Sequence, residues 1–408
     1  MSDAVRPYRI AVPDAALEVL RDKLEAAAYA PAADFADDWA SGAPLSEVRR
    51  LADYWRDGFD WRRHEARLNA LPHFATRVPV DGFGELDVHF LHQRSSRPDS
   101  IPLLFCHGWP GSFLEAVKIL PLLTEPKEEE GAPSFHLVAP SLPNFGFSQA
   151  VSRRGFGLAQ YAECAHRLML KLGYDRYVTQ GGDWGAIITR IIGLRYPDHC
   201  LASHVNFLVV RPPLWQAAWL GLRHWLGWSS ARERAGLARS AWYLAEGSGY
   251  MLLQSTKPAT LAFALADSPV ALLAWVYEKL HDWTDGYRWT DDEVLTWVSV
   301  YRFSAAGPAA SLRIYYEAFH ADFRGSLFAA GGYVPGVPLG VSHYPKDLLA
   351  PPRAVASASG PVVFEAVHDE GGHFAAYERP DLFAADLRAM FGTGGGACDV
   401  ARRFRSGS

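Results

Sequence analysis

The chain has few cysteines, four in 408 residues, and no long apolar run. The cysteines lie far apart and form no C-x-x-C pair, which argues against a disulfide framework and against a thiolate metal site. No stretch approaches the roughly 18 uninterrupted apolar residues of a membrane-spanning helix. No apolar run follows the first residues either. We therefore expect a cytoplasmic protein with reduced thiols and no stable membrane insertion.

An excess of basic charge is also missing. The chain carries 40 Lys and Arg against 45 Asp and Glu, and its formal net charge is −5. The basic doublets are scattered rather than gathered in one stripe, so a nucleic-acid partner is not expected. The 33 arginines against 7 lysines, with abundant alanine, are typical of a GC-rich bacterial genome. Hydrophobic residues make up 49% of the chain, enough to fill a large core.

The spacing of apolar residues changes along the chain. From Tyr8 to Thr76 the pattern is helical, in short pieces broken by Pro and Gly, and predicts an N-terminal extension that wraps a larger domain. From Leu86 apolar residues alternate, and short apolar runs follow at 102–106, 135–139 and 177–180. A helical pattern over 158–172 lies between two of these runs. Strands that alternate with helices predict an α/β core with a mostly parallel sheet.

A helical insertion interrupts this core. Nine of the fourteen tryptophans lie between residues 215 and 297, in runs of helical length and spacing. Strand-like segments return at 340–343 and 361–368, and a helix is expected over 380–391. The predicted organisation is an N-terminal meander (1–80), a first part of the core (81–210), a helical cap (211–315), a second part of the core (316–392) and a disordered tail (393–408).

The most specific local motif is Gly181-Gly182-Asp183-Trp184-Gly185, between a predicted strand and an apolar helix. It has the form of a nucleophile elbow, a tight strand-to-helix turn that presents one side chain above the sheet. A carboxylate in that position can displace a leaving group from saturated carbon and form an alkyl ester. The alternative is that Asp183 caps the following helix, which is a common role for Asp.

A second motif, His107-Gly108-Trp109-Pro110-Gly111, follows the strand at 102–106. In hydrolases with such an elbow, this loop supplies one oxyanion-hole N–H and the residue after the nucleophile supplies the other. Trp109 and Trp184 are therefore the expected donors. Taken alone, the motif is a turn with a structural histidine.

A third motif, Gly371-Gly372-His373, lies between the last predicted strand and the last helix. His373 is placed to activate a hydrolytic water, although a structural loop histidine is the alternative. Its carboxylate partner is expected to be Asp347, in competition with three others. Asp369 and Glu370 are too close in sequence to fold back easily. Glu365 remains the other competitor.

These motifs resemble the microsomal-type epoxide hydrolases of the α/β-hydrolase superfamily. The likeness covers nearly the whole chain and includes HGWPGS, GGDWG, GYMLLQSTKP, LADSPVALLAW and GGHFAAYERP. It implies an α/β-hydrolase core with a helical cap, no cofactor and no metal. It also implies a triad of Asp183, His373 and Asp347, with Tyr250 and Tyr315 holding the epoxide oxygen. Tyr316 is the competitor of Tyr315.

The chemistry agrees with two tyrosines. Ring opening creates an alkoxide, and a phenol with a pKa near 10 can share its proton while remaining protonated at neutral pH. Without the resemblance, both tyrosines would be assigned to packing of the cap. Trp242, eight residues and so about two helical turns before Tyr250, is the expected substrate contact. The alternative is that it only packs the cap.

The resulting hypothesis is an epoxide hydrolase that acts on a bulky apolar or aryl epoxide, in detoxification or natural-product biosynthesis. The expected partner is this small molecule, and a homodimer is left open. One alternative is a haloalkane dehalogenase, with Trp184 against the halide. Another is a non-catalytic protein that binds an apolar ligand, although such a protein has no need for a strained elbow that carries Asp.

Overall fold

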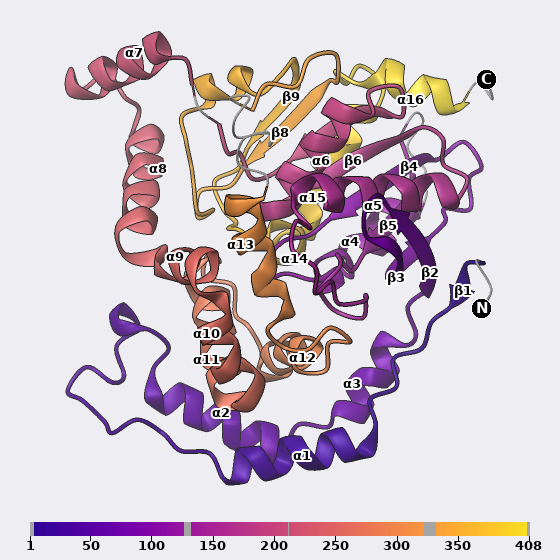
Figure 1. The fold of residues 1–408 in the computed structure, drawn as a ribbon. Coiled ribbons are helices and arrows are strands. Elements are labelled where there is room, and N and C mark those ends of the chain that lie inside the picture. Colours follow the sequence, from indigo (N-terminus) through magenta and orange to yellow (C-terminus); the bar gives the residue numbers. More distant parts are fainter. Residues whose placement is uncertain (1–3, 126–131, 211, 322–331, 406–408) are drawn as a thin grey trace.

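A mixed β-sheet forms the centre of the molecule (Figure 1). The computed structural model describes residues 4–125, 132–210, 212–321 and 332–405. In these residues the sheet has nine strands in the order β1-β2-β3-β5-β4-β6-β7-β8-β9. Neighbours from β5 to β9 are parallel, and the three pairs at the other edge are antiparallel. The strands are β1 (Arg6–Pro7), β2 (His73–Val80), β3 (Gly84–Gln93), β4 (Ile101–Cys106), β5 (Phe135–Pro140), β6 (Tyr177–Gly181), β7 (Cys200–Val205), β8 (Leu339–His343) and β9 (Val362–Val367).

The mostly parallel α/β core predicted from the sequence is confirmed. Strands β4, β5, β6 and β7 are buried along their whole length, because helices cover both faces of a parallel sheet. The core helices are α4 (Ile119–Thr124), α5 (Leu158–Lys171), α6 (Asp183–Arg195), α14 (Ala375–Glu378) and α15 (Pro380–Phe391), with a 3₁₀ turn, η2, at Phe113–Ala116 and another, η5, at Arg353–Ala358.

The sheet begins earlier in the chain than expected. The sequence pattern predicted helices as far as Thr76. In the structure, β2 already starts at His73 and pairs antiparallel with β3 along its whole length. In the strand, Ala75, Val78 and Val80 are buried against the core.

The N-terminal meander packs along the cap. It contains α1 (Asp14–Glu25), the 3₁₀ turn η1 (Trp39–Ser41), α2 (Leu45–Asp57) and α3 (Trp61–Leu68). In Figure 1, α1 and α2 run beneath α10 and α11. Arg50 donates to Asp291 at 2.6 Å, and the Tyr54 hydroxyl donates to Asp292 at 2.9 Å. These contacts tie α2 to the first turn of α12. The meander therefore fastens the cap to the body from outside.

The cap is entirely helical in the part that the structure describes. It contains α7 (Leu214–Trp225), α8 (Ala231–Trp242), a π-helical turn, η3 (Tyr243–Gly247), α9 (Gly249–Thr256), α10 (Pro258–Asp267), α11 (Pro269–Asp282), α12 (Asp291–Arg302), a 3₁₀ turn, η4 (Ala310–Leu312), and α13 (Arg313–His320). Within the described ranges no single helix has the length and apolar composition of a membrane span. Helices α10 and α11 reach that length and composition only when taken together, and they are bent by 114° relative to each other.

The tail is not disordered where the structure describes it. Residues Cys398–Arg405 form α16, which packs on α15. Val400 and Ala401 are buried, and Phe404 packs against the same cluster. The glycines of TGGG suggested disorder, but they only turn the chain so that this short amphipathic helix reaches the core. The last three residues lie outside the described part.

Candidate active site

Asp183 lies at a strained turn between β6 and α6. Its φ is +50°, in the left-handed region that residues with a side chain seldom adopt. The turn requires its glycines: a Cβ on Gly185 would lie 1.9 Å from the Cys106 carbonyl oxygen, and one on Gly181 would lie 2.3 Å from the Gly185 carbonyl oxygen. The residue before the helix is Gly182, so Asp183 is not the helix cap. The elbow is therefore built as the sequence motif predicts.

The loop after β4 contacts the Asp183 carboxylate directly. The Trp109 N–H donates to Asp183 Oδ1 at 2.9 Å. Gly108 allows this approach, because a Cβ there would lie 2.0 Å from the same oxygen. Trp109 thus stands where an oxyanion-hole donor is needed. Trp184, the other predicted donor, follows Asp183 in α6, and its buried ring packs edge-on against Tyr315 with centroids 4.9 Å apart.

His373 lies between two carboxylates. Its Nδ1 is 2.6 Å from Asp347 Oδ1, and its Nε2 is 3.4 Å from Asp183 Oδ2. The loops that carry the acid and the histidine meet through a bridge between Lys346 and Gly372. The His373 N–H also donates to the Trp283 carbonyl at 2.7 Å. Asp183, His373 and Asp347 therefore form one connected, buried triad.

The competing acids are occupied elsewhere. Glu365 accepts from Arg353 and pairs with His343 at 2.8 Å. Asp369 pairs with Arg232 at 3.0 Å, and Glu370 pairs with Arg379. Of the four candidates for the acid, Asp347 is the one whose carboxylate contacts His373.

The two neighbouring carboxylates determine the protonation state of His373. Burial lowers its pKa, but the Asp347 and Asp183 carboxylates outweigh this effect and raise the pKa well above its ordinary value. At neutral pH the ring in the resting site is therefore an imidazolium between two carboxylates.

Three tyrosines from the cap line the cavity above Asp183. Tyr250 lies in the first turn of α9, and its ring stacks on that of Trp109 with centroids 5.1 Å apart. Tyr315 lies in α13, edge-on to Tyr250. Its buried hydroxyl makes no hydrogen bond within the described residues. The competitor Tyr316 stacks on His320, and it is not among the residues that line the cavity.

Tyr243 was missed by the sequence analysis. Its hydroxyl lies 2.9 Å from the Tyr250 hydroxyl, and both side chains are buried in the cavity wall. Burial raises the pKa of Tyr250 and of Tyr315 well above the ordinary value, and raises that of Tyr243 to about 12. All three phenols are therefore protonated donors at neutral pH.

Trp242, the expected substrate contact, does not line the cavity above Asp183. Trp242 is part of the wall of a different pocket, and the Arg239 guanidinium lies 4.4 Å from the centre of its ring. The helix does not continue regularly from Trp242 to Tyr250, because a π-helical turn lies between them. This turn changes the direction in which the following side chains point. The neighbour Tyr243 takes the place expected for Trp242.

The cavity itself is small and apolar. It measures 160 Å³, and its wall includes the nucleophile, the three tyrosines and a majority of apolar side chains: Trp184, Ile187, Phe207, Val209, Leu244, Met251, Phe319, Leu348 and Leu349. Leu244 and Phe319 are also exposed to solvent, so they lie at its mouth.

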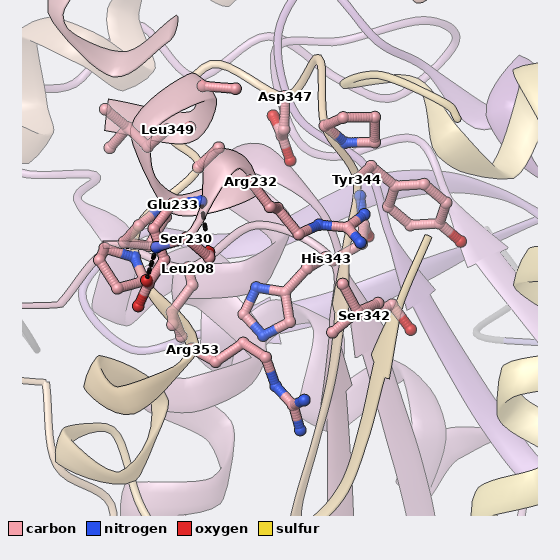
Figure 2. Close-up of a pocket in the computed structure, with 18 residues that line it drawn as sticks. Leu208, Ser230, Arg232, Glu233, Ser342, His343, Tyr344, Asp347, Leu349 and Arg353 are labelled. Carbon is pink, nitrogen blue, oxygen red and sulfur yellow. Dashed lines mark hydrogen bonds between the residues drawn. The ribbon is translucent and has the colours of Figure 1, made fainter. Parts of the chain in front are cut away.

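A neighbouring pocket of 300 Å³ lies between α8 and the end of β8 (Figure 2). Asp347 is part of its wall, but Asp183 and the tyrosines are not. Its charged side chains Arg232 and Arg353 are paired with acids. Because Asp183 does not line this pocket, the cavity above Asp183 is the better candidate for the substrate site. Among the described residues, no group of three or more His, Cys, Asp or Glu side chains is arranged to hold a metal ion.

Comparison with known proteins agrees with the geometry. Residues 5–116 match the family "Epoxide hydrolase N terminus", and residues 101–241 match "alpha/beta hydrolase fold". A putative epoxide hydrolase of Stigmatella aurantiaca is 39% identical over 395 residues, which are 95% of this chain and 84% of the relative. Epoxide hydrolase 1 of Sus scrofa is 33% identical, over 96% of this chain and 89% of its own.

Two solved structures are similar over most of their length. The epoxide hydrolase of Aspergillus niger superimposes with a TM-score of 0.80 at 34% identity and covers 95% of each chain. The juvenile hormone epoxide hydrolase of the silkworm Bombyx mori superimposes with a TM-score of 0.87 at 27% identity, over 99% of this chain and 96% of its own. The resemblance inferred from the motifs is thereby confirmed, together with the fold.

Proposed function

Since the chain belongs to the epoxide hydrolases of the α/β-hydrolase superfamily, we propose that it opens its substrate through an ester on Asp183. The observation that carries this mechanism is the connected triad of Asp183, His373 and Asp347 beneath a cavity lined by tyrosines. Asp183 Oδ1 is held by the Trp109 N–H, which leaves Oδ2 to attack one ring carbon. The bond from that carbon to the epoxide oxygen then breaks, and the oxygen takes a proton from a tyrosine.

The second half of the reaction cleaves the ester. Esterification removes the charge of Asp183, one of the two carboxylates that raise the pKa of His373, so that pKa falls when the ester forms. The imidazolium then loses its proton, which replaces the one that the tyrosine gave to the epoxide oxygen. The neutral ring accepts a proton from water as the water oxygen attacks Cγ of Asp183. The negative charge develops on Oδ1, where the Trp109 N–H already points. When this intermediate collapses, His373 gives the proton to the leaving alkoxide oxygen, which releases a vicinal diol, and the imidazolium forms again as the new Asp183 carboxyl group ionises.

Tyr243 supports Tyr250 in this scheme. When Tyr250 shares its proton with the epoxide oxygen, negative charge grows on the Tyr250 oxygen. The Tyr243 hydroxyl, 2.9 Å away, can donate to that oxygen. A donor in that position stabilises the charge as it grows in a site without bulk water, so Tyr243 assists the proton transfer from Tyr250. Tyr315, whose hydroxyl is unpartnered within the described residues, holds the epoxide oxygen alongside it.

The cavity limits the substrate class. A volume of 160 Å³ is close to the roughly 150 Å³ that accommodates a benzene ring in an apolar protein cavity. This size favours a small aryl or alkyl epoxide and argues against the bulky epoxide expected from the sequence. Leu244 and Phe319 at the mouth, rather than Trp242, are then the residues that set the size limit. The role in detoxification or biosynthesis, the cytoplasmic location and a homodimer stay predictions.

A panel of epoxides tests this proposal. Single-ring aryl epoxides should be converted to diols faster than two-ring aryl epoxides. Leu244→Ala and Phe319→Ala should each shift the preference toward the larger epoxides by roughly tenfold, the scale of a few methylene groups in an apolar pocket. Trp242→Ala is the matched control and should leave the preference unchanged. Diols are quantified by chiral chromatography.

The same panel contains chloroalkanes and bromoalkanes of equal size. Halide release faster than diol formation would favour the dehalogenase alternative and contradict the proposal. Binding of the epoxides without any turnover would favour the non-catalytic alternative. A preference shift in Trp242→Ala equal to that in Leu244→Ala would show that the mouth is assigned wrongly.

A further inference from the structure

Helix α7 carries an apolar face that no described residue covers. Leu214, Trp215, Trp219, Leu222 and Trp225 recur at helical spacing and fall within an arc of about 140° at 100° per residue. All five are exposed, Leu214 by 89% and Trp225 by 80%. Figure 1 shows α7 at the outer end of the cap, away from the sheet. An ordinary surface helix turns such a face inward.

The opposite side of α7 anchors it to the body. Gln216 is buried, and its Nε2 donates to the Ala354 carbonyl at 2.6 Å. Leu220 packs against the hydrophobic core. These contacts hold the helix with its tryptophans toward solvent, so the outward orientation is a feature of the fold. An exposed apolar patch of this kind marks an interaction surface.

The segment around this face has an excess of basic residues, although Arg223 pairs with Glu233 and Arg232 pairs with Asp369 in the folded chain. Residues 212–242 contain four arginines and one glutamate, whereas the whole chain has a net charge of −5. Between residues 212 and 232 the chain has no acidic residue at all. A helix with tryptophan and leucine on one side and arginines beside them has the composition of helices that lie in the plane of a membrane interface. Tryptophan in particular favours the headgroup level.

We propose that the α7 face is a peripheral docking surface for an anionic phospholipid bilayer. The tryptophans and leucines enter the headgroup region, and Arg223 of α7 exchanges its 3.4 Å contact with Glu233 for a lipid phosphate. A second copy of the chain is a poorer occupant, because a symmetric contact would bring the arginines of both copies together.

Vesicle sedimentation with the full chain tests this surface. The protein should sediment with vesicles that contain phosphatidylglycerol, and less with vesicles of phosphatidylcholine alone. The triple variant Trp215→Gln/Trp219→Gln/Trp225→Gln should bind at least about tenfold more weakly, because it loses most of the apolar area. Arg223→Gln should weaken binding to the anionic vesicles only, as added salt should. The control Phe35→Gln/Phe263→Gln removes comparably exposed rings outside α7 and should bind like the wild type.

Turnover of a dissolved epoxide and the melting temperature should be unchanged in the triple variant, which separates this surface from the reaction. If the triple variant is unstable, the single change Trp225→Gln, at the most exposed of these rings, takes its place. Equal losses in the phenylalanine control would contradict the proposal. So would a wild type that binds neither vesicle but sediments as a dimer that the triple variant converts to a monomer, since the face would then join two copies of the chain.

Discussion

His373→Gln should be alkylated by an epoxide and then fail to release it. The first step needs only the Asp183 carboxylate and the tyrosines, whereas ester hydrolysis needs a base for the water. Glutamine keeps a donor toward Asp347, so the acid stays paired in its buried site. Steady-state turnover should fall by roughly 10²–10⁴-fold, the usual contribution of a general base. Intact-protein mass should rise by the mass of one substrate molecule.

Asp183→Ala is the matched control for this result. It removes the nucleophile, so its mass should stay unchanged in the same substrate. A His373→Gln protein that loses turnover without gaining mass would contradict the assignment of His373 to the second step. Mass gain in Asp183→Ala would show that another side chain reacts.

The tyrosines should affect the first step instead. Tyr250→Phe and Tyr315→Phe should each slow alkylation in a single turnover, because each removes one donor to charge that appears only as the ring opens. The double variant should lose roughly 10²–10⁴-fold, and each single variant less, since the remaining tyrosine still donates. Quenched-flow measurement of the ester and of the diol separates the two steps. Ester hydrolysis should proceed at nearly the wild-type rate in every variant.

Two further tyrosines serve as comparisons. Tyr316→Phe should behave as the wild type, because Tyr316 stacks on His320 and does not line the cavity. Tyr243→Phe should slow alkylation in the presence of Tyr250 and have no additional effect in Tyr250→Phe, since it acts through that residue. Slower ester hydrolysis in Tyr250→Phe or Tyr315→Phe, or a severe loss in Tyr316→Phe, would contradict these roles.

The nucleophile and the histidine could be found from the sequence because their signals are local. The positive φ of Asp183 needs small neighbours, and these are the glycines that the motif displays. Choosing between Asp347 and Glu365 requires the distance of each carboxylate from His373 in the folded chain. The spacing of these residues along the sequence does not determine that distance. The pairing of Glu365 with Arg353 and His343 becomes visible only in the folded chain.

The misses have physical causes too. The extrapolation from Trp242 to Tyr250 assumed a regular helix, and the π-helical turn broke that regularity. Gly247 and Gly249, which lie between Trp242 and Tyr250, indicate in the sequence that a regular helix is disfavoured there. The contacts between α2 and α12 join residues about 240 positions apart, as in the pair Arg50 and Asp291, so no local pattern could show that the meander fastens the cap.

The covalent ester is tested most directly by one turnover in ¹⁸O-labelled water with enzyme in excess over the epoxide. Water attacks Cγ of Asp183, so its oxygen should enter the carboxylate while the diol keeps an unlabelled oxygen from Oδ2. Peptide mass spectrometry should then find the label in the segment that contains Asp183, and the first diol should contain none. A first diol that carries ¹⁸O, with an unlabelled Asp183, would mean that water attacks the epoxide ring directly and would contradict the account.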